Sequence, residues 1–160
     1  VEAFMSASEK VDRALRAGAL TVGGSVKITT LPGYLPIQSD EAMLELYRAN
    51  AASLVGEENL VRLRHLTGST DMGDVSHLMP ALHPYVSAAT GKAHGDDYVV
   101  QDYDLAVLTG ARAMAATVVD LLAGGGRRGR EVLSRHQAPM TKKGYLSFMR
   151  GLFSEETFQE

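Results

Sequence analysis

The sequence predicts an α/β protein, and three observations support this class. Ser25–Leu31 alternates in polarity and is rich in β-branched residues, which is typical of a strand. Apolar residues recur at helical spacing over residues 7–22, over residues 39–56 and from about Asp102 to Leu122. Strand patterns that alternate with helical patterns favour the α/β class. Even so, the sequence shows few strands for so many helices.

The composition excludes several classes of function. The chain has 160 residues, of which 45% are hydrophobic and 22% charged, as in globular proteins. Its net charge of −3 gives no electrostatic reason to bind nucleic acid. No apolar run approaches the roughly 20 residues of a membrane span, and no signal-peptide pattern is present. We therefore expect a cytoplasmic protein that binds neither membranes nor nucleic acids. Because cysteine is absent, any metal must be held by His, Asp or Glu.

The first 31 residues predict a strand–helix–strand unit. Val1–Met5 is a short apolar run that fits a first strand, and Ser6 and Glu9 fit a capping box for the helix that follows. Ser25–Leu31 then returns as the second strand, so the unit implies parallel strands with a right-handed crossover. A unit this short cannot bury a core by itself. We expect it to pack on another part of the protein.

A linker and further elements are predicted after this unit. Pro32–Pro36 breaks the pattern and divides the chain into residues 1–37 and residues 38–160. The later elements are a helix capped by Ser39 or Asp40 and ending at Gly56, strands at 59–66 and 82–88, a helix from Asp102 or Asp104 to about Leu122, a glycine stop at 124–126, a basic helix at 127–135 and a last helix capped by Thr141. Asn50 lies on an apolar helix face, and we interpret it as a hydrogen-bonded core amide.

Two glycine-containing loops carry the candidate site. They are Gly68–His77 and Ala93–Asp97, and loops rich in titratable groups are frequent places for sites. His94 is flanked by Ala93 and Gly95, which leaves room at its ring for a metal ion. The alternative is a loop histidine that is hydrogen-bonded to a neighbouring carboxylate, and spacing alone favours this alternative.

The first loop also has two interpretations. Asp71 and Asp74 fit the start of a short helix, where carboxylates commonly cap the turn and complement the helix dipole. In the functional interpretation, the backbone amides of Gly68–Thr70 form a concavity for a substrate carboxylate or oxyanion. His83 is predicted to be structural, in a strand before Pro84. His65 and His136 have no predicted role.

Three motifs resemble the C-terminal catalytic segment of the metal-dependent amidohydrolases. They are Gly68–Ser76, His83–Val86 and Ala93–Tyr98. The resemblance is to the aminoacylase and carboxypeptidase superfamily, on the branch of the aminobenzoyl-glutamate hydrolase B subunit. It is close over residues 39–123 and looser at both ends. It implies hydrolysis of amide bonds in N-acyl amino acids, dipeptides or related conjugates, with a pair of divalent metals, usually zinc or manganese.

The same resemblance implies an architecture and site residues. Residues 1–37 match half of a small ferredoxin-like lid, which makes the dimer in the family. Residues 38–160 match the C-terminal part of a catalytic α/β/α sandwich. His94 matches the last metal-binding histidine. The loop at the substrate end of the site is matched by Gly68, Ser69, Thr70 and Asp71.

The family takes its general-base glutamate and its other metal ligands from segments that precede the one matching Val1. A zinc ion takes about four ligands, and His94 supplies one. We therefore expect a C-terminal fragment of a hydrolase that is inactive alone. We expect it to form a homo-oligomer and to join an N-terminal half that is deleted, cleaved or separately encoded. The alternatives are a non-catalytic truncated scaffold for oligomerisation and a metal-free binding module for small carboxylates.

Overall fold

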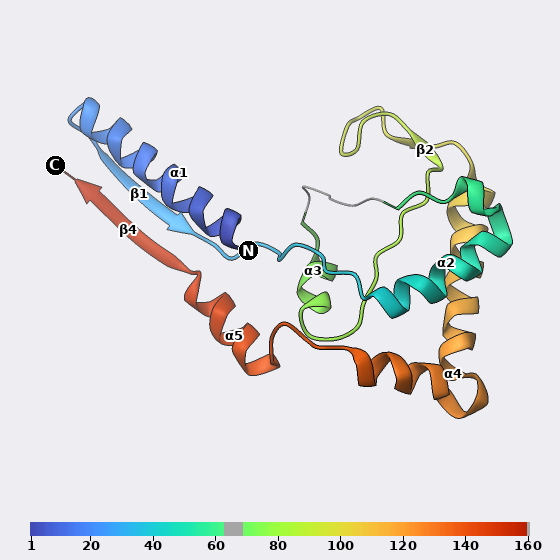
Figure 1. The fold of residues 1–160 in the computed structure, drawn as a ribbon. Coiled ribbons are helices and arrows are strands. Elements are labelled where there is room, and N and C mark those ends of the chain that lie inside the picture. Colours follow the sequence, from blue (N-terminus) through green and yellow to red (C-terminus); the bar gives the residue numbers. More distant parts are fainter. Residues whose placement is uncertain (63–68, 160) are drawn as a thin grey trace.

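The computed structural model is a mixed helix-and-sheet structure and describes residues 1–62 and 69–159. In chain order its main elements are α1 (Glu2–Thr21), β1 (Ser25–Thr30), α2 (Glu41–Val55), α3 (Asp71–Ser76), β2 (Ala89–Thr90), β3 (Val99–Val100), α4 (Gly110–Arg135), α5 (Lys142–Gly151) and β4 (Ser154–Gln159). Figure 1 shows α1 beside β1 and β4 in one group, α2 beside α4 in the other, and α3 between the two groups.

The strand predicted at Val1–Met5 is wrong, because helix α1 already begins at Glu2. Glu, Ala and Met are strong helix formers, and an apolar run becomes a strand only where another strand pairs with it. The partner of β1 is β4, and the pair is antiparallel, with Val26 opposite Phe158. The predicted parallel crossover is therefore also wrong. Strand β1 itself is confirmed, and Ile28 is its buried residue.

Helix α1 turns its polar side toward the sheet. Arg16 pairs with Glu156 of β4 at 2.9 Å. The apolar residues predicted to face a core are instead exposed, with Val11 57% and Leu15 46% accessible. An amphipathic helix normally buries its apolar stripe. In this structure that stripe of α1 is available to another surface.

The helix predicted from Asp40 to Gly56 is confirmed as α2. The Oδ1 atom of Asp40 accepts a hydrogen bond from the Met43 N–H at 3.0 Å, as an N-cap residue does. The core role of Asn50 is also confirmed. Its Nδ2 lies within hydrogen-bond distance of the Leu46 carbonyl, of Thr117 Oγ1 and of Asp120 Oδ2, at 3.1, 3.3 and 2.9 Å respectively. Asn50 thereby joins α2 to α4.

The predicted interruption in the long C-terminal helix is confirmed. A π-helical turn, η2 (Asp104–Thr109), leads into α4, and Ala123–Gly126 have non-helical backbone angles inside it. The three glycines of this break, Gly124–Gly126, all have positive φ, which glycine adopts without steric cost. The basic helix over residues 127–135 then follows. Thr141 caps α5, accepting from the Gly144 N–H at 3.1 Å.

Helix α4 packs against α2. Ala113 and Thr117 are buried on α4. The larger apolar residues of the predicted stripe are exposed, with Val119 64% and Leu122 69% accessible. By length and composition alone, an 18-residue stretch within Asp104–Arg135 is apolar enough to cross a membrane, and 17% of that stretch is buried. Core helices of soluble proteins meet the same criterion.

The two predicted middle strands are not formed within the described residues. A short 3₁₀ turn, η1 (Glu57–Asn59), follows α2, residues 60–62 are irregular, and residues 63–66 lie outside the described residues. Leu82–Ala88 has no ladder, because Pro84 lacks the N–H that pairing needs. The next strand pairing along the chain is that of β2 with β3, which form a short antiparallel hairpin.

Few large hydrophobic side chains are buried. The buried hydrophobic residues among those described are Ile28, Leu35, Ala51, Ala81, Ala88, Ala113 and Val132. Most of these are small, whereas a domain of this length usually buries most of the surface of its unfolded chain. The hydrophobic core of the described residues is therefore small for a chain of 160 residues.

Candidate functional site

His94 lies in the loop of the β2–β3 hairpin, and a tight backbone turn builds this loop. Gly91 has a φ of +88°, and a Cβ placed on it would lie 2.2 Å from the carbonyl oxygen of Asp97. Only glycine fits such a close backbone approach. The Gly95 N–H donates to the Lys92 carbonyl at 2.6 Å, which closes the loop around His94. The sequence pattern of small residues around His94 therefore reflects a compact turn.

His94 itself is exposed and has a φ of +63°. A left-handed backbone is uncommon for residues with a side chain, although histidine is among those enriched there. The conformation costs about 1–2 kcal/mol. Strained residues that persist in this way are concentrated at functional sites. The geometry presents the imidazole to the surroundings on a rigid turn.

The two carboxylates after His94 have different surroundings. Asp97 Oδ1 accepts a hydrogen bond from the Lys92 N–H at 3.1 Å, so this oxygen is used to close the loop. Asp96 is exposed. The imidazole of His94 is thus the nitrogen ligand that the loop could offer a metal. The carboxylate of Asp96 is exposed two residues further along.

The proposed substrate loop leads directly into α3. The Asp71 Oδ1 atom accepts from the Met72 N–H at 2.9 Å and from the Thr70 hydroxyl at 3.0 Å. The carboxylate therefore occupies the start of α3, as in the capping interpretation, where it complements the helix dipole. Ser69 and Thr70 precede it in irregular backbone. Gly68, the first residue predicted for this loop, lies outside the described residues.

The rest of α3 faces the protein interior. Asp74 Oδ1 accepts from the Leu35 N–H at 2.9 Å, and Ser76 Oγ accepts from the Gln38 N–H at 3.0 Å. His77 is 2% exposed, and its Nδ1 lies 2.8 Å from the Gly73 carbonyl oxygen. His77 is therefore a buried structural residue, although the sequence placed it among the titratable groups of the loop.

The structure does not bring the candidate residues into one cluster. Figure 1 draws the β2 hairpin at the top of the α2–α4 group and α3 lower down, between the two groups. Within residues 1–62 and 69–159, no three or more His, Asp or Glu side chains form a group able to hold a metal. A single imidazole does not supply the about four ligands that zinc takes. The described residues alone therefore do not fit a complete metal site, and we assign no chemical step to a metal.

His136 had no predicted role, and the structure pairs it with Asp40. The His136 Nδ1 atom lies 2.8 Å from Asp40 Oδ2, and both side chains are largely buried. Burial by itself raises the pKa of Asp40. Hydrogen bonds from the Met43 N–H and His136, together with the charge of His136, outweigh burial and leave that pKa below its ordinary value. The two residues are 96 positions apart, so no local pattern signals the pair.

His83 was predicted to be structural and to lie in a strand. It lies in irregular backbone, partly buried, with its ring centroid 5.0 Å from that of Tyr85. Its strand setting is wrong because no ladder forms there. The structural role itself remains a prediction.

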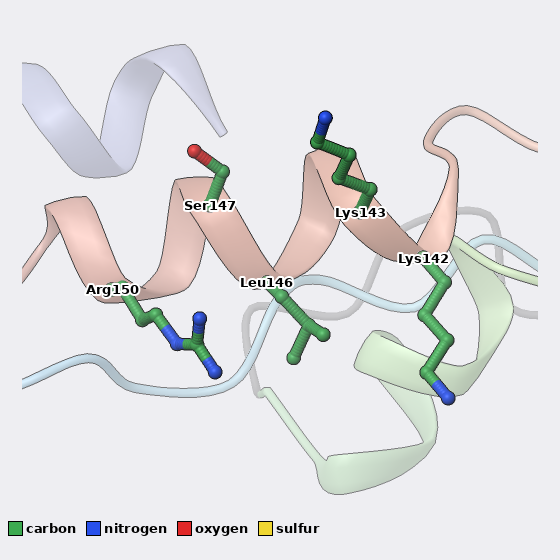
Figure 2. A pocket seen from close by; sticks show the side chains of 5 residues that line it. All are labelled: Lys142, Lys143, Leu146, Ser147 and Arg150. Carbon is green, nitrogen blue, oxygen red and sulfur yellow. The ribbon is translucent and has the colours of Figure 1, made fainter.

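An open hollow of about 610 Å³ lies along α5. Its lining residues are Lys142, Lys143, Leu146, Ser147 and Arg150. Figure 2 shows Lys142, Leu146 and Arg150 pointing from one side of α5, whereas Lys143 and Ser147 point from the other. Leu146, the apolar residue of this lining, is 37% exposed. The hollow is shallow and lined mainly by flexible cationic side chains.

Comparison with known proteins points to a peptidase. The mouse (Mus musculus) relative is 31% identical over 124 residues, and the human (Homo sapiens) relative is 27% identical over 125 residues. Both are Xaa-Arg dipeptidases. Each match covers 72% of this chain and 28% of the relative, so the chain spans little more than a quarter of their length. The chain is thus distantly homologous to Xaa-Arg dipeptidase over part of its length. No family model and no solved structure matches the chain.

Proposed function

We propose that this chain is part of a metal-dependent amidohydrolase that cleaves amide bonds in dipeptides, N-acyl amino acids or related conjugates. The observation that carries the proposal is the similarity to Xaa-Arg dipeptidase over most of the chain. In the proposed enzyme, His94 supplies one ligand to a divalent metal, zinc or manganese. The segment Gly68–Asp71 supplies the substrate end of the site.

The setting of His94 supports its role as a shared ligand. The ring is exposed on a turn held by Gly91 and by the Gly95–Lys92 hydrogen bond. A metal ligand that meets residues from another part of the protein needs such access and rigidity. The chain spans 28% of the length of its relatives, and in the proposed enzyme the remaining ligands and the general base come from an N-terminal half.

The exposed apolar faces support the same arrangement. Val119 and Leu122 on α4 and Val11 on α1 lie outside the packed regions. Large exposed apolar patches usually mark surfaces that another structure covers. We propose that the N-terminal half covers α4, completing a catalytic α/β/α sandwich. Residues 1–37 belong to a lid that mediates a homo-oligomer.

The substrate preference also follows from the relatives. Dipeptides that end in arginine are the first substrates to test, because both relatives are named for them. We propose that backbone N–H groups of Ser69 and Thr70 receive the carboxylate of a dipeptide, as successive N–H groups do in anion-binding concavities.

The decisive experiment joins the chain to an N-terminal half that carries the missing ligands. We expect metal-dependent hydrolysis of Xaa-Arg dipeptides by the joined protein and none by the chain alone. His94→Ala should abolish most of the activity and reduce the metal content, with the fold intact by circular dichroism. Loss of a metal ligand removes most of the function of such sites.

His83→Ala is the matched control. It removes a partly buried imidazole of the same chain, so it should lower the melting temperature and leave the metal content unchanged. Two results would oppose the proposal. One is full activity and metal content in His94→Ala. The other is robust metal-dependent turnover by the chain alone, which would place a complete site within it.

A further inference from the structure

Helix α3 joins three parts of the chain that are distant in sequence. One is the connection from β1 to α2, around Leu35, and another is the segment from Met140 to α5. The third is the Ser69–Asp71 turn, which leads into the helix. In Figure 1, α3 lies where these connections run between the two groups of elements. The two connections are therefore both within reach of one short helix.

The contact between α3 and Leu35 is unusually close. A Cβ placed on Gly73 would lie 1.7 Å from the Leu35 carbonyl oxygen, and no side chain fits at that distance. One residue further, Asp74 Oδ1 accepts from the N–H of the same Leu35 at 2.9 Å. Leu35 is itself 4% exposed. A carboxylate that accepts from a buried amide makes a stronger hydrogen bond than a neutral acceptor.

Two further bonds hold the same junction. Ser76 Oγ accepts from the Gln38 N–H at 3.0 Å, and the His77 carbonyl accepts from the Met140 N–H at 3.1 Å. The Asp74 carboxylate also raises the pKa of the Tyr145 hydroxyl of α5, after burial. Asp74 and Ser76 therefore hold the connection from β1 to α2, and the His77 carbonyl holds the segment that leads to α5.

We infer that Asp74 is a positioning residue: by holding Leu35 it fixes α3, and with it the Ser69–Asp71 turn. Asp74 lies one helical turn after Asp71, and the Gly73 N–H donates to the Thr70 carbonyl at 2.7 Å. Displacement of α3 therefore displaces the turn directly. The role of the turn in binding substrate rests on the proposed function, but its dependence on Asp74 does not.

Hydrogen exchange of the purified protein tests whether Asp74 holds α3 and the Ser69–Asp71 turn in place. Asp74→Ala should speed exchange at the Leu35 amide by about ten- to a hundredfold, the range expected for a lost bond to a charged group. It should also speed exchange at the Gly73 amide, which reports on the turn. Asp102→Asn is the control, because Asp102 Oδ1 accepts from the Leu105 N–H at 2.8 Å, a local bond at the start of η2. It should leave both amides unchanged.

Asp74→Asn provides a rescue and a spectroscopic check. The asparagine oxygen still accepts from Leu35, so exchange should return toward the wild-type rate. Burial raises the pKa of Tyr145 first, and the hydrogen bond and charge of Asp74 raise it further. Removing the charge should therefore lower that pKa in an ultraviolet titration, with Tyr145→Phe used to assign the signal.

Enzyme kinetics test whether the position of the turn affects substrate binding. In the joined enzyme, Asp74→Ala should raise KM for a Xaa-Arg dipeptide by about tenfold, with a smaller change in kcat, because a displaced turn loses substrate contacts. Unchanged exchange at Leu35 and Gly73 in Asp74→Ala would overturn the inference. So would faster exchange with unaltered KM in an active enzyme. If the joined wild-type enzyme is inactive, the proposed function fails. Hydrogen exchange at the Gly73 amide in Asp74→Ala then decides whether Asp74 fixes the turn.

Discussion

Asp40 and His136 form a nearly buried pair in which Asp40 Oδ2 lies 2.8 Å from His136 Nδ1. The other oxygen of Asp40 caps α2 through the Met43 N–H. One carboxylate thus fixes the start of α2 and holds the residue that directly follows α4. Because α2 and α4 pack along each other, this pair closes one end of their contact.

We predict that Asp40→Asn lowers stability at neutral pH and makes it less dependent on pH in the acid range. The folded-state pKa of Asp40 is lowered, so its contribution is fully present above the ordinary value of about 3.9 and is lost as pH falls through the folded pKa. The melting-temperature difference between wild type and variant should therefore shrink as the pH falls below about 4. A constant difference across that range would contradict the prediction.

Asn50→Ala should destabilise the α2–α4 contact by about 1–3 kcal/mol, because it leaves Asp120 and Thr117 without their shared donor. Urea unfolding measures this change. Ser53→Ala is a control on the same helix, since Ser53 is exposed and bonds only to the local Asn50 carbonyl. A loss no larger than that of the control would show that the amide does not join the helices.

Gly91→Ala should destabilise the β2–β3 hairpin by about 1–2 kcal/mol or more, because alanine avoids positive φ and its Cβ meets the Asp97 oxygen. Gly33→Ala is the matched control, with nothing within 4 Å of its added Cβ. Chemical denaturation compares the two, and nuclear magnetic resonance locates the shift near His94. Equal stability of both variants would argue against the turn geometry.

Val119→Lys combined with Leu122→Lys should weaken association of the chain. The two residues expose 64% and 69% of their surface on α4, and charges there oppose burial against another structure. In analytical ultracentrifugation, the double variant should no longer join the proposed N-terminal half. Val61→Lys, at an exposed position outside the regular elements, should leave this joining unchanged.

Local chemistry explains which elements were predictable. Asp40 and Thr141 cap their helices as predicted, and the three glycines after Leu122 interrupt α4, because capping and positive φ depend on adjacent residues. Asn50 was recognised because an amide on an apolar face needs partners. Such inferences need no knowledge of distant segments.

The strands were harder to predict because pairing depends on partners elsewhere in the chain. Val1–Met5 has no strand beside it and becomes helical, whereas the polar segment Ser154–Gln159 becomes β4 because β1 offers a free edge. Similarly, Leu82–Ala88 is apolar enough for a strand but contains Pro84 and finds no neighbour.

The sequence by itself determined the helix caps and glycine turns, and it selected His94 and the Ser69–Asp71 turn as candidates. Only the tertiary structure decided that His77 is buried, that His136 pairs with Asp40 and that Asp74 holds Leu35. The physical reason is the separation along the chain of the residues that interact. Capping and glycine conformations are set within a few residues, whereas burial and long-range hydrogen bonds exist only once separate segments have packed together.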